Sequence, residues 1–142
     1  IQPLLDESNS NPSRITVFNL WRRFDKDGVD APFALCDSRT VSEKELIPTD
    51  LFNYGKQEEN TETLADENGF TVEIYQSMNS DDHQWYFYPK MNREEVVMFK
   101  TYDSNEKPFM PTLHSAFDDA VHAREGATPR ESIEVRAICF YD

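Results

Sequence analysis

The feature of this chain that most limits its fold is a series of short stretches rich in β-branched and aromatic residues, each ended by turn-forming residues. These strand-like stretches cover residues 15–21, 33–36, 70–75, 83–88, 96–102 and 130–141. No internal repeat or long amphipathic helix accompanies them, and one helical turn is expected between Thr40 and Leu46. The sequence therefore predicts a mainly β protein, with antiparallel strands in a barrel or sandwich and few short helices.

The clearest pair of strands is expected in the aromatic middle of the chain. Phe70–Tyr75 alternates apolar and polar residues, Asn79–Asp82 is rich in turn-forming side chains, and His83–Tyr88 has the composition of a returning strand. Residues 53–69 are polar and acidic, which predicts a surface loop, with a lid over a bound substrate as the alternative. We therefore expect a hairpin that joins 70–75 to 83–88.

The last strand-like stretch carries the strongest functional signal. Alternate side chains of a strand face opposite ways, so this stretch has one polar and one apolar face. The polar face holds Arg130, Ser132, Glu134 and Arg136, and the apolar face, which is expected to pack, holds Ile133, Val135, Ala137 and Cys139. An arginine and a hydroxyl two residues apart can together bind a carboxylate. The same alternation is also typical of a solvated strand with cross-strand charge pairs, so the pattern alone leaves both interpretations open.

Composition excludes several classes of partner. The 142 residues include 14 basic and 27 acidic side chains, which gives a net charge of -13. Such an excess repels phosphate backbones and anionic lipids, and no apolar run approaches the roughly 20 residues of a membrane span. We expect one cytoplasmic domain over 1–142 that binds a small molecule and neither nucleic acid nor membrane. Cys36 and Cys139 lie in apolar runs and are expected to be free, buried thiols.

Seven blocks of sequence occur together in a recognisable order. They are Asn19–Arg22, Pro32–Val41, Leu46–Asp50, His83–Met91, Glu95–Ser104, His114–Phe117 and Pro129–Arg136. The set resembles a fungal and bacterial hydroxylase/desaturase family that includes the gibberellin desaturase, the aspergillic-acid hydroxylase/desaturase and the oxygenase component of cephamycin methoxylation. The resemblance extends from about Ile15 to the C-terminus.

The resemblance implies an oxidoreductase of secondary metabolism, a non-haem Fe(II)/2-oxoglutarate-dependent dioxygenase that hydroxylates or desaturates a small metabolite. The implied fold is an antiparallel double-stranded β-helix of the jelly-roll or cupin-like type. It further implies that His114 is a metal ligand and that Arg130 and Ser132 bind the distal carboxylate of 2-oxoglutarate. The candidate substrate contacts are Asn19, Arg22, His83, Trp85, Tyr86, Lys100 and Arg136. Lys100 has a structural alternative, which is an ion pair with Asp103 or Glu134.

One part of the family pattern is missing from this sequence. Members of the family are longer and carry a His-x-Asp segment upstream of the Asn-x-Trp-Arg block, whereas no histidine here has an acidic residue two positions later. We therefore expect the C-terminal part of a larger oxygenase, with an incomplete β-helix and an incomplete metal site. An in-chain triad of His83, Asp103 and His114 is the alternative.

Two further alternatives remain at this point. Arg124 follows His114 by ten residues and is a rival to Arg130 as the co-substrate arginine. The chain is alternatively a non-catalytic β-sandwich or cupin-like module for a small ligand, or a degenerate paralogue, because it lacks the His-x-Asp segment. The sequence specifies neither the substrate nor the oligomeric state.

Overall fold

The computed structural model describes residues 11–24, 31–54, 70–119 and 129–142. These residues form β-strands and two 3-10 helices, so the expected mainly β class is confirmed. The chain divides into two compact units, one of residues 1–41 with 82–142 and one of residues 42–81. No helix among the described residues is long and apolar enough to cross a membrane.

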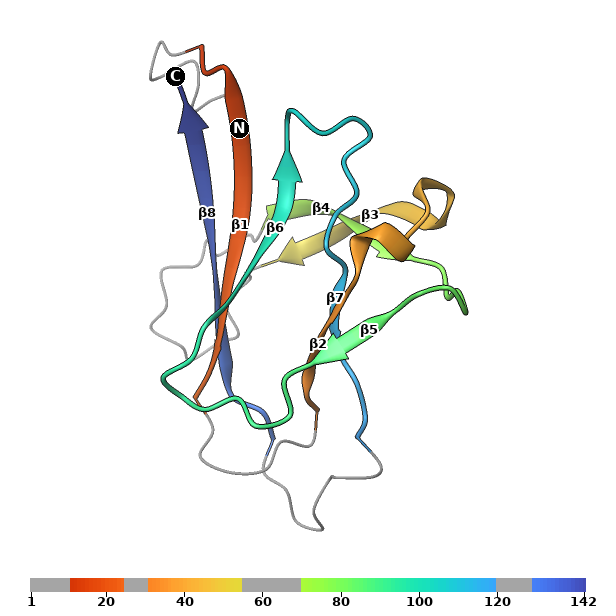
Figure 1. Ribbon diagram of the computed structural model, residues 1–142, viewed down its shortest axis with the longest axis vertical. Coiled ribbons are helices and arrows are strands. Elements are labelled where there is room, and N and C mark those ends of the chain that lie inside the picture. The colour runs from red at the N-terminus through yellow and green to blue at the C-terminus, as the bar shows by residue number, and fades with distance from the viewer. Residues whose placement is uncertain (1–10, 25–30, 55–69, 120–128) are drawn as a thin grey trace. The chain divides into compact units, whose positions relative to one another are not determined.

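The larger unit contains a three-stranded antiparallel sheet in the order β6-β1-β8 (Figure 1). Strand β1, Arg14–Arg23, lies in the centre, between β6, Val97–Asp103, and β8, Ser132–Tyr141. All three strands match stretches that the sequence predicts. Every residue of β1 pairs with a residue of β8, and residues 16–21 also pair with a residue of β6. The side chains of paired residues lie on the same face of the sheet.

A second three-stranded sheet in the same unit has the order β5-β2-β7 (Figure 1). Its central strand β2, Phe33–Cys36, has the predicted bounds, and its neighbours are β5, Trp85–Phe87, and β7, His114–Ala116. Leu35 pairs with Tyr86 on one side and with His114 on the other. This sheet therefore fixes the position of His114.

The core of the larger unit joins its two sheets. Trp21 of β1 and Phe33 of β2 stack with their ring centroids 4.3 Å apart and their planes 8° apart. Trp21, Met91 and Phe99 form the buried cluster, against which Phe33, Leu35 and Val97 pack. Aromatic stacking across the two sheets therefore holds their inner faces together.

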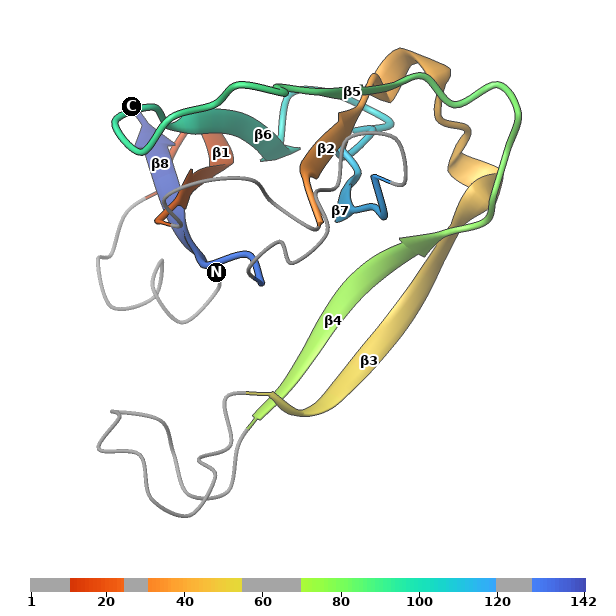
Figure 2. The same cartoon turned by 90° about the horizontal axis from the view of Figure 1, so that it is seen from below.

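The smaller unit is built on a two-stranded ribbon. Strands β3, Leu46–Tyr54, and β4, Phe70–Ser77, pair in antiparallel fashion (Figure 2). The 3-10 helix η2, Glu43–Glu45, precedes β3, and η1, Ser38–Thr40, ends the first segment of the larger unit. These two short helices occupy the region where one helical turn is expected.

The predicted hairpin of 70–75 with 83–88 is wrong. Strand β4 pairs with β3, and β5 pairs with β2 instead. Pro48 obscures β3 in the sequence because proline lacks the N–H of a regular ladder, but a two-stranded ribbon has open edges that tolerate it. In the expected loop, residues 53 and 54 belong to β3, and 55–69 lie outside the described residues.

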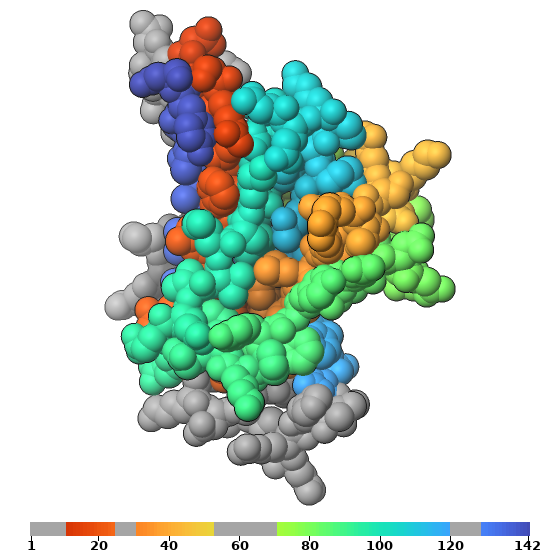
Figure 3. Space-filling view, viewed as in Figure 1, coloured from red at the N-terminus to blue at the C-terminus, as the bar shows by residue number. Residues whose placement is uncertain are grey.

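One face of the β6-β1-β8 sheet carries exposed apolar side chains. Ile133 is 49% exposed and Val135 is 54% exposed, so the expected packing of this face does not occur at these two positions. Figure 3 shows the side chains of β8, β1 and β6 next to one another on the surface. Cys139, farther along β8, is partly buried, and Cys36 is buried; both are free thiols, as expected.

Candidate functional site

A buried asparagine organises the polar face of β8. The Asn19 side chain is fully buried, and its Nδ2 donates a hydrogen bond of 2.6 Å to Glu134 Oε1. Its Oδ1 accepts hydrogen bonds from Arg136 Nε at 3.2 Å and from Thr101 Oγ1 at 3.3 Å. Glu134 and Arg136 therefore lie on the same face as Asn19, as the alternation in β8 predicts.

His114 has an orientation that leaves one ring nitrogen available. Its Nδ1 lies 3.1 Å from the carbonyl oxygen of Thr112, which favours the tautomer with the proton on Nδ1. Its Nε2 lies 3.9 Å from Glu134 Oε2, beyond hydrogen-bond range. The ring packs against Phe99 with centroids 4.7 Å apart, and 32% of the side chain is exposed. The bond from Nδ1 to a backbone carbonyl group is the outer contact that a metal-ligating imidazole typically makes, and it leaves the Nε2 lone pair available.

The described residues do not complete a metal site. No group of three or more His, Cys, Asp or Glu side chains among them is close enough to hold a metal ion. His83 makes an edge contact with Trp85, with ring centroids 6.5 Å apart, and Asp103 belongs to a separate charged cluster. The alternative triad of His83, Asp103 and His114 is therefore not assembled. His114 and its neighbour Glu134 supply donors of the right chemistry for part of a two-His, one-carboxylate site.

Asp103 is the centre of a closed charged cluster at the end of β6. Its buried carboxylate accepts hydrogen bonds from Arg14 Nε at 2.9 Å, Lys100 Nζ at 2.7 Å and the Asn105 backbone N at 3.1 Å. These bonds, that from Arg14 foremost, hold the pKa of Asp103 well below its usual range. Lys100 also pairs with Glu106. Lys100 thus has the structural ion pair that the sequence offered as an alternative to substrate binding.

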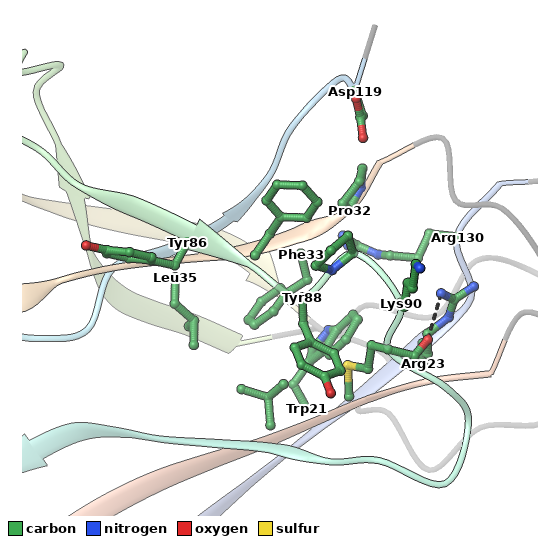
Figure 4. Close-up of a pocket in the computed structure, with 14 residues that line it drawn as sticks. Trp21, Arg23, Pro32, Phe33, Leu35, Tyr86, Tyr88, Lys90, Asp119 and Arg130 are labelled. Carbon is green, nitrogen blue, oxygen red and sulfur yellow. Dashed lines mark hydrogen bonds between the residues drawn. The ribbon is translucent and has the colours of Figure 1, made fainter. Parts of the chain in front are cut away.

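A large pocket lies beside the core of the larger unit. Its volume is about 890 Å³. Aromatic and aliphatic side chains form most of its wall, and four charged residues complete it (Figure 4). The lining consists of Trp21, Arg23, Pro32, Phe33, Leu35, Tyr86, Phe87, Tyr88, Pro89, Lys90, Met91, Val97, Asp119 and Arg130. Tyr86 and Arg130 are two residues of this wall that the sequence predicts for the site.

Arg130 is held in place by a backbone carbonyl group and an aromatic ring. It precedes β8 by two residues, its Nη1 donates to the carbonyl oxygen of Ala31 at 2.9 Å, and its Cζ lies 5.7 Å from the centre of the Trp21 ring. No carboxylate of the described residues pairs with it. Ser132, the second predicted co-substrate residue, begins β8, is exposed and is in register with Arg23. An oriented guanidinium without an acidic partner in this part of the chain is suited to a carboxylate ligand.

The other predicted substrate contacts lie outside the pocket wall. Arg22 Nε donates to the Arg93 carbonyl oxygen at 2.6 Å, which follows from its place on the opposite face of β1 from Trp21. Trp85 is exposed beside His83, and Arg136 is bound to Asn19. Arg124, the rival to Arg130 as the co-substrate arginine, lies outside the described residues. Short alternating strands therefore separate neighbours in sequence onto different faces.

Sequence reasoning missed several residues of the pocket. Trp21 and Arg23 share the face of β1 that carries Asn19, so the alternation in that strand contained a usable signal. Phe33 stacks on Trp21, a contact between sheets that no local pattern indicates. Lys90 follows the short strand β5 in a turn, where composition gives no functional signal.

Comparison with known proteins relates the chain to fungal oxidoreductases. The family described as oxidoreductase/YMDC permease-like domain, YDMC, matches residues 3–140. The Fe(II)/2-oxoglutarate-dependent dioxygenase nvfI of Aspergillus novofumigatus is 30% identical over 90% of this chain and 41% of its own length. The hydroxylase/desaturase asaB of Aspergillus flavus is 27% identical over 92% of this chain and 57% of its own length. The chain thus spans about half the length of the curated relatives it matches.

Solved structures give the same relationship. The iron and alpha-ketoglutarate-dependent endoperoxidase NvfI, in a different conformation, matches 90% of this chain and 42% of its own chain with a TM-score of 0.69 and 30% identity. A second NvfI structure matches 91% of this chain and 43% of its own, with a TM-score of 0.70 and 29% identity. The β architecture of this chain is therefore similar to part of that enzyme.

Proposed function

The chain belongs to the oxidoreductase/YMDC permease-like family, and on this premise we propose that it is part of a non-haem Fe(II)/2-oxoglutarate-dependent hydroxylase or desaturase of a small metabolite. Its relatives include fungal hydroxylase/desaturases and a Fe(II)/2-oxoglutarate-dependent dioxygenase. The observation that carries the proposal is Arg130, which is oriented by Ala31 and Trp21 and has no acidic partner among the described residues.

The proposed co-substrate site is formed by Arg130 and Ser132. The guanidinium fork of Arg130 donates paired hydrogen bonds to the distal carboxylate of 2-oxoglutarate, and the Ser132 hydroxyl adds a neutral one. The Ala31 carbonyl group and the Trp21 ring hold the guanidinium in place, so little side-chain entropy remains to be lost on binding. The aromatic wall of the pocket excludes water around the bound acid.

His114 is the proposed metal ligand of this chain. The bond between Nδ1 and the Thr112 carbonyl group presents Nε2 as the ligating atom, and Glu134 lies next to it. Fe(II) bound there, with ligands from beyond the described residues, would supply the oxygen activation that hydroxylation or desaturation requires. Asn19 holds Glu134 in this position through its side-chain amide.

The fold proposed for the whole protein is a double-stranded β-helix. The two three-stranded antiparallel sheets of the larger unit, with their inner faces joined through Trp21 and Phe33, support this proposal as one share of such a fold. The TM-score of 0.69 to an iron and alpha-ketoglutarate-dependent endoperoxidase supports it further. We also propose that the protein is cytoplasmic. We further propose that it has no nucleic-acid partners, because the net charge of -13 repels phosphate.

Isothermal titration calorimetry with 2-oxoglutarate tests the co-substrate site. Arg130→Ala should weaken binding at least about tenfold, because it removes a charge-assisted fork. Arg39→Ala is the matched control, since Arg39 is exposed and paired with Asp37. Equal affinities of the two variants would contradict the assignment.

A visible charge-transfer band of the Fe(II) and 2-oxoglutarate chelate tests the metal ligand under anaerobic conditions, measured on the whole protein that carries the remaining ligands. The band should be lost in His114→Ala and retained in His83→Ala, because His83 lies beside Trp85 and outside the proposed site. A band that persists in His114→Ala would show that the iron is held elsewhere.

A non-catalytic, cupin-like binding module is the second candidate function. It is favoured by the absence of three clustered metal donors among the described residues. Such a module needs no metal, so it would bind its ligand equally well in the presence of a chelator and would give no chelate band. The two functions therefore differ in the same spectroscopic measurement.

A further inference from the structure

We infer that the pocket lined by Trp21, Phe33, Tyr86, Lys90 and Arg130 binds an amphipathic organic anion, a flat apolar ring system that carries a carboxylate. The inference rests on the proposed function in identifying this anion as the substrate and in assigning Arg130 to the co-substrate. Its recognition requires neither iron nor 2-oxoglutarate.

The pocket wall is suited to flat rings. Five aromatic side chains line it, namely Trp21, Phe33, Tyr86, Phe87 and Tyr88. Tyr86 and Tyr88 are each 60% exposed, so a ligand that covers them removes apolar surface from water. A volume of about 890 Å³ lies within the range of sites that hold drug-sized molecules.

The charge around the pocket is opposite in sign to that of the chain. Three cationic side chains, Arg23, Lys90 and Arg130, line it together with one acidic residue, Asp119, in a chain whose net charge is -13. Lys90 makes no hydrogen bond or ion pair with any other described residue. Such a local excess of positive charge attracts an anion against the overall field of the protein.

The cations can be divided between two anions. Arg130 is assigned to the co-substrate by the proposed function. Lys90 remains for a second carboxylate, beside Arg23, whose Nη1 donates to the Met91 carbonyl oxygen at 3.1 Å. In the close-up these charged side chains lie toward one end of the pocket, and Tyr86 and Leu35 lie toward the other (Figure 4). This polarity matches a molecule with one charged end and one apolar end.

Calorimetry with a matched pair of ligands tests the inference. The probes are anthracene-9-carboxylate and the neutral anthracene-9-carboxamide, titrated into the purified chain without iron or 2-oxoglutarate. The carboxylate should bind at least about tenfold more tightly, because only it forms charge-assisted hydrogen bonds. Lys90→Gln should remove most of that preference and leave carboxamide affinity unchanged. Lys44→Gln, at an exposed lysine of the smaller unit, is the control and should retain the preference.

Arg130→Ala separates the inferred site from the co-substrate site. The preference for the carboxylate should persist in this variant. A preference that is lost in Arg130→Ala and kept in Lys90→Gln would place the anion on the co-substrate arginine and overturn the inference. Equal affinity for the two probes in the unmodified chain, or no binding of either, would also overturn it. None of these results alters the chelate band, so failure here is distinct from failure of the proposed function.

Discussion

Lys90 and Lys100 lie ten positions apart in the same larger unit, yet their surroundings are opposite. Lys100 bonds to the buried carboxylate of Asp103 and to Glu106, and its charge is already matched by two acids. Lys90 lines an aromatic pocket and has no ionic partner among the described residues. A cation with several fixed partners stabilises the fold, whereas a cation beside an apolar wall without such partners is available to a ligand.

The largest effect is expected from breaking the closed cluster at its centre. Asp103→Ala leaves Arg14 and Lys100 without their shared acid, and we expect the midpoint of thermal unfolding to fall by roughly 10 °C. Glu94→Ala is the matched control, because the Glu94 side chain is 89% exposed and lies 3.9 Å from Arg22. Similar losses in both variants would mean that the cluster has no special structural role.

A smaller loss of stability is expected from removing the buried amide of Asn19. Asn19→Ala removes the partner of Glu134, Arg136 and Thr101, and it should lower the free energy of unfolding by about 1–3 kcal/mol. Urea unfolding measures this loss, with Asn79→Ala at an exposed position as control. An unchanged stability would show that the network does not depend on its buried amide.

The closed cluster around Asp103 should also make the stability of the fold depend on pH. The pKa of Asp103 is lowered by Arg14 and Lys100, so its contribution is complete above the pKa of an unfolded aspartate, about 4, and is lost as pH falls through the folded value. The stability difference between the unmodified chain and Asp103→Asn should therefore narrow below about pH 4. Asp37, whose pKa is lowered to about 2 mainly by its hydrogen bonds with the exposed Arg39, is the counterpart with a single cationic partner and should give a smaller change in Asp37→Asn. A difference that stays constant down to pH 2 would contradict this account.

The smallest effects compare the two lysines directly. Lys100→Gln should lower the unfolding midpoint by about 2–4 °C and leave anthracene-9-carboxylate binding unchanged. Lys90→Gln should do the reverse, with lost carboxylate preference and an unchanged midpoint. Differential scanning fluorimetry and calorimetry on the same preparations provide both values. If either substitution changed both the unfolding midpoint and the binding of the carboxylate, Lys90 and Lys100 would not have the separate roles described here.

Local sequence patterns predicted strands and strand faces, but they did not predict which lysine is available to a ligand. The bounds of β2 follow from a short apolar run, and the polar face of β8 follows from the period of two of a strand. Lys100 was a candidate for substrate binding because it interrupts an apolar strand, but its partner Asp103 lies three residues away on the same strand. Lys90 gave no signal because its role depends on aromatic side chains brought from other strands.

The pairing of strands was the least predictable feature. Strand β4 has the pattern of a hairpin partner for 83–88, but pairing depends on competition among all available edges, and β3 offers a longer one. The hydrogen bond from Asn19 to Glu134 is equally hard to predict from local sequence patterns, because 115 positions separate the two residues. Contacts of this range arise only once the sheet has formed.

The place of β1 between β6 and β8 has a consequence for the synthesis of the chain. The first described strand finds one of its two neighbours in the last, and Ser13 and Tyr141, which meet there, are 128 positions apart. Closing so long a loop is slow, and a nascent chain exposes the unpaired edge of β1 until β8 has emerged from the ribosome. A chain that ends before Arg130 would lose both this edge protection and the proposed co-substrate arginine, so incomplete products would be prone to aggregate.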